Sequence, residues 1–210
     1  KSVALRAALM AMLAEGNSTI CHYSDCADAL ALLGVFDALG GDYRHEGDTL
    51  WVQGRSWKVQ ESRVECGESA FLARTLPVLL PSMGISAVVD GRGTLVQRSQ
   101  TDLLAVLRVL GIPYQSGGDY LPVAVSATDL DARVVLPPQR TSQVASGVLM
   151  AMGMMPKRVE VENLPTSSGG YLQLTLQIMR HFGVSWREDA PGKLLKPAGG
   201  LYRAVEFCCE

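Results

Sequence analysis

The chain has 210 residues, of which 48% are hydrophobic and 19% are charged, and its formal net charge is −2. This composition is typical of a globular protein with a real core and excludes a disordered chain. The charge balance also provides no global field for nucleic acid or anionic membranes. No apolar run in the sequence reaches the ~20 residues of a membrane span.

The first predicted element is a helix at about 2–14, in the opening sequence KSVALRAALMAMLAEG. Its residues are apolar on nearly every side, which is typical of a helix buried all round. The strand NSTICHYS, a second helix at about 26–39 and a hairpin follow. Gly40 stands where the second helix ends, and glycine is the residue that best adopts the left-handed backbone of a helix C-terminus.

The same order of elements recurs twice more. Gly40, Gly111 and Gly183 mark equivalent helix ends, and they lie about 70 residues apart. Such a period is too long for a solenoid unit and predicts three copies of a small βαβαββ subdomain. The copies span about 1–55, 56–128 and 129–204, and the first lacks its leading strand. The apolar helices of the later copies are at about 68–80 and 142–154, their strands are ISAVVDG and RVEVEN, and their second helices are at about 100–110 and 170–182.

Two patterns indicate how the copies are layered. TSQVASGVLMAMGMMP is apolar almost all round, so this helix is expected to be buried. RVEVEN alternates strictly, so its strand is expected to have one face in water. We therefore predict an α/β fold (α+β type) in which the helices are inside and the sheets outside. No linker interrupts the copies, so residues 1–210 are expected to form one pseudo-threefold domain.

The cysteines and histidines do not indicate a metal centre or a nucleophile–base pair. The cysteine count is odd and lacks CxxC pairs, which argues against a disulfide framework and a zinc site. We expect free thiols, a reducing cytoplasm and structural histidines. The residues concerned are Cys21, Cys26, Cys66, Cys208, Cys209, His22, His45 and His181.

Polar residues gather at the starts of the buried helices. Helix N-termini present free N–H groups and a positive dipole end, so hydroxyls and cations placed there favour an anion site. Ordinary N-capping by Ser and Thr is the alternative. Because three related copies bring similar helix ends together, we expect a shared phosphate pocket. The residues are Lys1, Ser2, Glu68, Ser69, Thr141, Ser142, Gln143 and the run from Ser167 to Tyr171 that includes Ser168.

Three arginines and two aspartates add charge near these helix starts. Arg6 and Arg74 fall inside apolar helical runs, where an unpaired guanidinium is costly. An internal carboxylate partner is one explanation, and an anionic ligand is the other. Arg98 lies in a loop just before a helix, where it could be a plain surface residue. Asp25 and Asp28 are expected to cap and charge the first turn of the helix at about 26–39.

Five segments in chain order resemble the enolpyruvyl transferase family, and within it the 5-enolpyruvylshikimate-3-phosphate synthases. The opening resembles the family's K-S-x-x-x-R-A-L start, and TSQVASGVLMA resembles S-S-Q-x-x-S-A-L-L-M-A. The other segments are CGESAFLAR, GRGTLVQRSQTDLLAVLRVLG and GGYLQLTLQIMRHFGV. The family has two inside-out lobes of three βαβαββ copies each. The resemblance therefore implies that this chain is one lobe, and that the partner lobe is absent from it.

The resemblance also implies roles for the polar residues. Lys1 is expected to be catalytic and to face phosphoenolpyruvate, with Arg74 and Arg98 beside that substrate. The other subsite is expected to bind shikimate 3-phosphate, and it comprises Ser2, Arg6, Thr141, Ser142, Gln143, Ser168 and Tyr171. The family pattern is broken at Leu5 and Ser99, at 169–170, and at 68–71, where Asn-Ala-Gly-Thr is replaced. Glu68 is unfavourable beside an anion unless Arg74 or Lys1 neutralises it.

The implied activity of the whole enzyme is transfer of the enolpyruvyl group of phosphoenolpyruvate to the 5-hydroxyl of shikimate 3-phosphate, with release of phosphate. No metal or cofactor is expected, and the partners are those two substrates and the second lobe, with neither nucleic acid nor membrane. The family's proton-shuttling acids lie on the other lobe, so this chain alone is expected to be inactive. The alternatives are a UDP-N-acetylglucosamine enolpyruvyl transferase-like enzyme and a non-catalytic ligand-binding module on the same fold.

Overall fold

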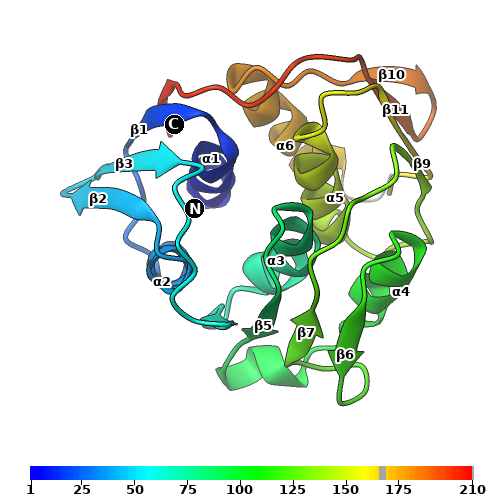
Figure 1. The fold of residues 1–210 in the computed structure, drawn as a ribbon, viewed down its shortest axis with the longest axis horizontal. Helices are drawn as coiled ribbons and strands as arrows, with labels where there is room; N and C mark the ends of the chain where they lie inside the picture. The colour runs from blue at the N-terminus through cyan, green and yellow to red at the C-terminus, as the bar shows by residue number, and fades with distance from the viewer. Residues whose placement is uncertain (166–168, 210) are drawn as a thin grey trace.

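The strands form three sheets on the outside of the molecule, with helices between them (Figure 1). The structure is a computed structural model that describes residues 1–165 and 169–209. Within these ranges each sheet has four strands. The first repeat contributes β1 (Gly16–Cys21), β2 (Asp42–Glu46) and β3 (Thr49–Gly54), and the second contributes β4 (Arg63–Glu65), β5 (Ala87–Asp90), β6 (Tyr114–Ser116) and β7 (Val123–Val125). The third contributes β8 (Arg133–Val135), β9 (Val159–Glu162), β10 (Arg187–Ala190) and β11 (Lys193–Lys196), and the last strand is β12 (Glu206–Cys208).

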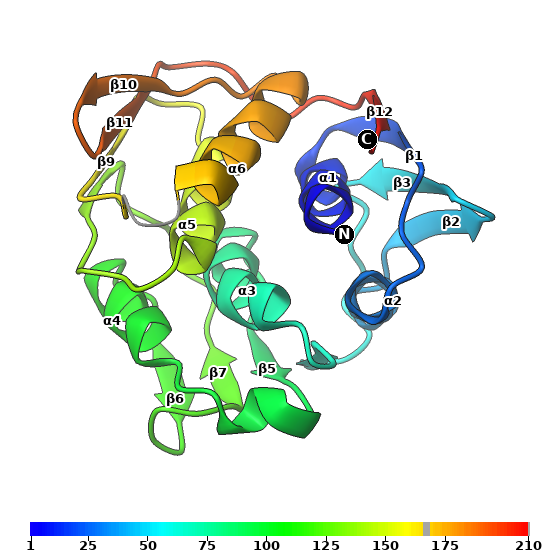
Figure 2. The ribbon, with the colours of Figure 1, turned by 180° about the vertical axis from the view of Figure 1, so that it is seen from behind.

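The helices occupy the interior of this ring of sheets (Figure 2). The most deeply buried are α1 (Ser2–Leu13), α3 (Ala70–Ser82) and α5 (Gln143–Gly153). Each is followed in its repeat by a helix with more exposed residues: α2 (Ala27–Ala38), α4 (Thr101–Val109) or α6 (Gly169–His181). The short 3₁₀ helix η1 (Gly93–Gln97) precedes α4. The predicted inside-out α/β fold is thus confirmed.

Close contact between α3 and α5 depends on a missing side chain. A Cβ atom at Gly147 would lie 3.1 Å from the Thr75 Cα atom, closer than packed side chains normally come. The small residue therefore lets the two helix backbones approach each other. This contact places the N-terminal halves of α3 and α5 side by side.

The alternating strand β9 has the predicted wet face. Val159 and Val161 are buried, whereas Glu160 and Glu162 lie on the outer face and form ion pairs with Lys193 at 3.4 Å each.

Among the described residues, no helix is long and apolar enough to cross a membrane.

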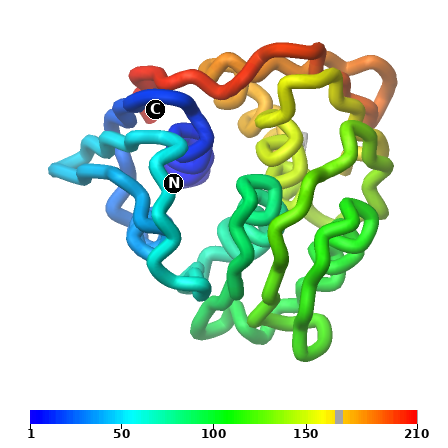
Figure 3. The backbone as a smooth tube through the Cα atoms, in the orientation of Figure 1, coloured from blue at the N-terminus to red at the C-terminus, as the bar shows by residue number. Residues whose placement is uncertain are grey.

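The strand that the first repeat lacks is provided by the far end of the chain. β12 pairs parallel with β1, with Thr19 opposite Glu206 and Cys21 opposite Cys208. The leading strands β4 and β8 pair parallel with β5 and β9 in the same way. Figure 3 shows the last segment crossing from the third sheet to the first repeat. All three sheets therefore have one topology, although the first is built from both ends of the sequence.

Candidate functional site

One cavity joins the starts of α1, α3, α5 and α6. Its volume is about 520 Å³. Free backbone N–H groups at helix starts favour anions, so the four helix starts contribute positive charge to the cavity. Its lining also includes the carboxylates of Asp28 and Glu68. The cavity is lined by Lys1, Ser2, Leu5, Arg6, Asp28, Glu68, Ala70, Phe71, Arg98, Thr141, Ser142, Gln143 and Tyr171. Eight of these are residues that the sequence predicts to bind substrate.

Arg6 is a buried cation with neutral partners. Arg6 is only 3% exposed, and its Nε donates to Thr175 Oγ1 at 2.8 Å. The guanidinium also donates to the Ser2 carbonyl and lies 4.3 Å from the centre of the Phe71 ring. Burial lowers the pKa of Arg6 to about 10, so it stays charged at neutral pH. Among the described residues no carboxylate forms an ion pair with it, so its charge is available to an anion in the cavity.

Thr175 holds this arginine in place, and sequence reasoning missed it. Its hydroxyl donates to the Tyr171 carbonyl at 3.0 Å and accepts from Arg6. The hydroxyl of Ser146 lies 2.9 Å away, so the network joins α1, α5 and α6. The available signal was a hydroxyl on the apolar face of a predicted helix, which is the group that a buried arginine requires.

The starts of α3 and α5 differ in how their serines are used. Ser69 caps α3 in the ordinary way, since its side chain accepts from the Leu72 N–H at 3.5 Å. Ser142 occupies the equivalent position of α5 and is 2% exposed, but its side chain makes no capping bond. Thr141 and Gln143 flank it on the cavity wall. The N-capping alternative therefore holds for Ser69 and fails for Ser142.

Glu68 is held by a loop rather than by the predicted cations. It accepts from the Thr94 N–H and hydroxyl, both at 2.9 Å, and these bonds lower the pKa of its carboxyl. Gly93 permits this approach, since its φ is +60° and a Cβ there would lie 2.5 Å from the Glu68 carboxyl carbon. Arg98 is exposed and donates to the same Thr94 hydroxyl at 3.0 Å. Neither Arg74 nor Lys1 forms an ion pair with Glu68 in the described part of the chain.

Lys1 and Asp28 form an ion pair across the cavity. The Lys1 Nζ lies 3.3 Å from an Asp28 carboxylate oxygen. The sequence predicts that Asp25 and Asp28 cap α2 and charge its first turn, and Asp28 does lie in that turn. Neither it nor Asp25 caps α2, because the N-cap is Cys26, and Asp25 lies 3.5 Å from His45 instead. The capping part of that prediction is wrong.

Arg74 lies behind the cavity wall. Its guanidinium donates to Gln143 Oε1 at 2.6 Å and to Gln100 Oε1 at 3.4 Å. It lines a neighbouring cavity of about 290 Å³ with Arg140 and Asp102. Burial lowers its pKa. Arg74 therefore contacts the main cavity only through its hydrogen bond to Gln143, which is one of the residues that line that cavity.

The last predicted residues lie at the start of α6. Tyr171 is on the cavity rim, 57% exposed, with its ring 5.8 Å from the Arg6 guanidinium carbon. Ser168 lies outside the described residues. Among the described residues, one side of the cavity offers the buried Arg6 cation without an ion-pair partner, the Ser142 hydroxyl that makes no capping bond, and helix N-termini. The other side offers the Glu68–Thr94–Arg98 group. The first set is suited to binding a phosphate.

A family model described as EPSP synthase (3-phosphoshikimate 1-carboxyvinyltransferase) matches residues 1–203. The chain belongs to the EPSP synthase family. Family membership was predicted from the five sequence segments, and it is confirmed.

Relatives within this family cover the chain almost completely. A 3-phosphoshikimate 1-carboxyvinyltransferase of Thermus thermophilus is 31% identical over 223 residues, covering 99% of this chain and 51% of its own length. One of Brevibacillus brevis is 28% identical over 194 residues, covering 90% and 45%. An EPSP synthase structure from Acinetobacter baumannii has a TM-score of 0.83 at 24% identity, covering 99% and 47%. The chain therefore spans about half the length of the relatives it matches.

Proposed function

We propose that this chain is the shikimate 3-phosphate-binding lobe of a 3-phosphoshikimate 1-carboxyvinyltransferase. The single observation that carries the proposal is Arg6, a buried cation without a carboxylate partner among the described residues. It lines the same cavity as Ser142, whose hydroxyl makes no capping bond at the start of α5. A phosphate would neutralise the arginine and accept from the serine hydroxyl. Charge-assisted hydrogen bonds of this kind are the strong ones in proteins.

The remaining residues divide between two subsites. In this proposal Ser2, Thr141 and Ser142 surround the phosphate with Arg6, and Gln143 contacts the ring of the substrate. Tyr171, and Ser168 by family resemblance, complete that subsite. Lys1 and Arg98 face phosphoenolpyruvate, and Arg74 acts on the site by holding Gln143.

The proposed reaction adds the 5-hydroxyl of shikimate 3-phosphate to C2 of phosphoenolpyruvate while C3 accepts a proton. The resulting tetrahedral intermediate expels phosphate. Lys1, Arg6 and Arg98 would stabilise the anionic oxygens throughout, as fixed charges that need no rearrangement. The partner lobe would close the cavity and provide the proton-transferring acids. The absence of any cofactor and the cytoplasmic location stay predictions.

The test is a titration of the ¹⁵N-labelled chain with shikimate 3-phosphate, together with an assay of phosphate release. We expect weak saturable shifts at residues 2, 141–143 and 171, none with unphosphorylated shikimate, and no turnover. R6Q should abolish the shifts. R55Q is the matched control, because Arg55 donates to the Leu13 carbonyl at the opposite end of α1. Turnover by this chain alone, or equal binding by R6Q, would overturn the proposal.

Glu68 gives a specific reason to keep the non-catalytic module as a second candidate. Its carboxylate, already bound by Thr94, occupies the side of the cavity where phosphoenolpyruvate would lie. Coexpression with the partner lobe of a relative distinguishes the two, since an enzyme lobe would restore phosphate release and a binding module would not. The UDP-N-acetylglucosamine alternative gains no support from the family match.

A further inference from the structure

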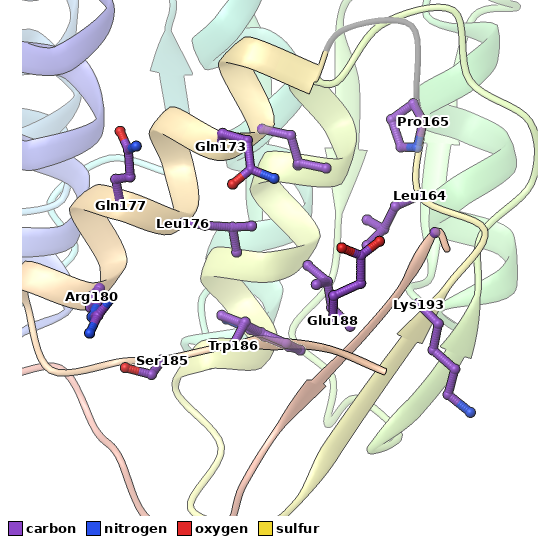
Figure 4. Close-up of a pocket in the computed structure, with 13 residues that line it drawn as sticks. Leu164, Pro165, Gln173, Leu176, Gln177, Arg180, Ser185, Trp186, Glu188 and Lys193 are labelled. Carbon is purple, nitrogen blue, oxygen red and sulfur yellow. The ribbon is translucent and has the colours of Figure 1, made fainter. Parts of the chain in front are cut away.

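A second and larger cavity lies on the other side of α6, between this helix and the third sheet. Its volume is about 680 Å³, within the usual range of small-molecule sites. Figure 4 shows Leu176 and Gln173 of α6 pointing into it, with Trp186 and Glu188 opposite. Neither the sequence nor the proposed function gives this cavity a role.

The three repeats carry an equivalent pair of residues at this place. One member lies three residues before the marker glycine, on the second helix, and the other is an aromatic residue three after it. In the first repeat Tyr43 Oη donates to Asp37 Oδ1 at 2.8 Å. In the second, the Arg108 guanidinium donates to Tyr114 Oη at 2.9 Å. Each pair ties a helix to an edge strand of its sheet.

The pair of the third repeat, Arg180 and Trp186, cannot form this tie. An indole N–H and a guanidinium are both donors and have no acceptor. Trp186 Nε1 is buried without a hydrogen-bond partner. Among the described residues, Arg180 likewise has no hydrogen bond or ion pair. The Trp186 N–H is therefore a buried donor without an acceptor, which is costly, whereas the Arg180 guanidinium lines the same cavity but is exposed to solvent.

The other charges of the cavity limit what the acceptor can be. Lys193 is already bound by Glu160 and Glu162 on the outer face. Glu188 pairs in register with Leu194, so both face α6, and it has no ion pair within the described ranges. Arg180 can neutralise one negative charge of a ligand, whereas Glu188 would repel any further negative charge. A ligand with one carboxylate is therefore favoured over a ligand with two. Leu172 and Leu176 provide an apolar wall.

We propose that this cavity binds a small monocarboxylate with an apolar body. The carboxylate accepts from Trp186 Nε1, which gives the buried indole N–H an acceptor, and forms an ion pair with the exposed Arg180 guanidinium. The apolar body packs on Leu172, Leu176 and Leu194. The site is separate from the helix-start cavity, and its existence does not depend on the proposed function.

The probe is 3-phenylpropionate, titrated against the ¹⁵N-labelled chain while the indole N–H signals are followed. W186F identifies the signal of Trp186. We expect a saturable shift of that signal, and no shift with 3-phenylpropanol, which keeps the apolar body but lacks the charge. R180Q should weaken binding at least ~10-fold, as expected for loss of a charge-assisted hydrogen bond. R187Q is the matched control, because Arg187 is exposed and pairs with Leu195 on the opposite face of β10.

The variant W186Y sharpens the test, because it recreates the Arg–Tyr pair of the second repeat. A tyrosine hydroxyl can accept from Arg180, so this variant should bind 3-phenylpropionate at least ~10-fold more weakly while melting no lower than the wild type. Equal binding of the alcohol, or undiminished binding by W186Y, would overturn the proposal. These two results decide the matter even if R180Q fails to fold.

Discussion

The two sides of the helix-start cavity differ in how their polar groups are satisfied. On the side of α1 and α5, Arg6 and Ser142 leave a charge and a hydroxyl for a ligand. On the side of α3, Ser69 caps its helix and Glu68 accepts from Thr94. Ser69 and Ser142 thus occupy equivalent helix starts but differ in role, since Ser69 caps its helix and Ser142 leaves its hydroxyl for a ligand. We infer that anion affinity is concentrated on the first side.

The largest expected effect is at Arg6. R6Q should weaken binding of shikimate 3-phosphate by ~100-fold, because it removes a desolvated charge and its hydrogen bonds to the phosphate. Isothermal titration calorimetry measures this, with R55Q as the control. A loss of less than threefold in a folded R6Q would show that the phosphate does not bind on this side.

A loss of intermediate size is expected for S142A. The hydroxyl makes no capping bond, so its removal should cost ~10-fold in affinity and leave the melting temperature unchanged. S69A is the matched opposite, since losing a cap costs ~1 kcal/mol of stability and should leave affinity unchanged. Calorimetry and thermal melts of both variants check the contrast. If S142A melts lower and binds normally, the two serines have the same role.

T175V tests whether Arg6 needs its support. Losing this hydroxyl should weaken binding by ~5-fold, less than R6Q, because the guanidinium stays but loses its neighbour. The Nε–H signal of Arg6 should shift in the variant even without ligand. An unchanged Nε–H signal would contradict the positioning role of Thr175.

The smallest effect is expected at Glu68. E68Q should raise the affinity for phosphoenolpyruvate a few-fold at low salt, by removing an exposed negative charge that salt screens. Because Thr94 lowers the Glu68 pKa, the wild-type carboxylate stays charged as pH falls through the ordinary glutamate range. Wild-type affinity should therefore rise only below that range, whereas E68Q should show no such step. The Thr94 bonds to Glu68 stabilise the folded chain above the ordinary glutamate pKa. This contribution to the free energy of unfolding is lost as the pH falls through the lowered pKa of Glu68.

Much of the fold could be predicted from sequence, because each repeat carries its own local signals. Apolar helices, alternating strands and Gly40, Gly111 and Gly183 identified the elements, and all three glycines have positive φ. Arg6 was also recognisable, since a charge in an apolar helix needs an explanation. The boundaries of the repeats remain a prediction.

The partners of the charged residues could not be predicted. That Thr175 holds Arg6, and that Thr94 holds Glu68, depends on contacts between segments far apart in the chain. The position of Arg74 behind Gln143 is of the same kind, because helix periodicity places a residue on a face without stating what lies opposite.

The pairing of β12 with β1 has a consequence for how the molecule assembles. Ile20 and Phe207 meet only when nearly the whole chain is available, so the ring of sheets is completed by its most distant contact. Contacts of such long sequence separation form slowly, because the entropy of closing the intervening loop is lost before they form. During synthesis on the ribosome, β1 therefore cannot pair with β12 until nearly all of the described chain has emerged.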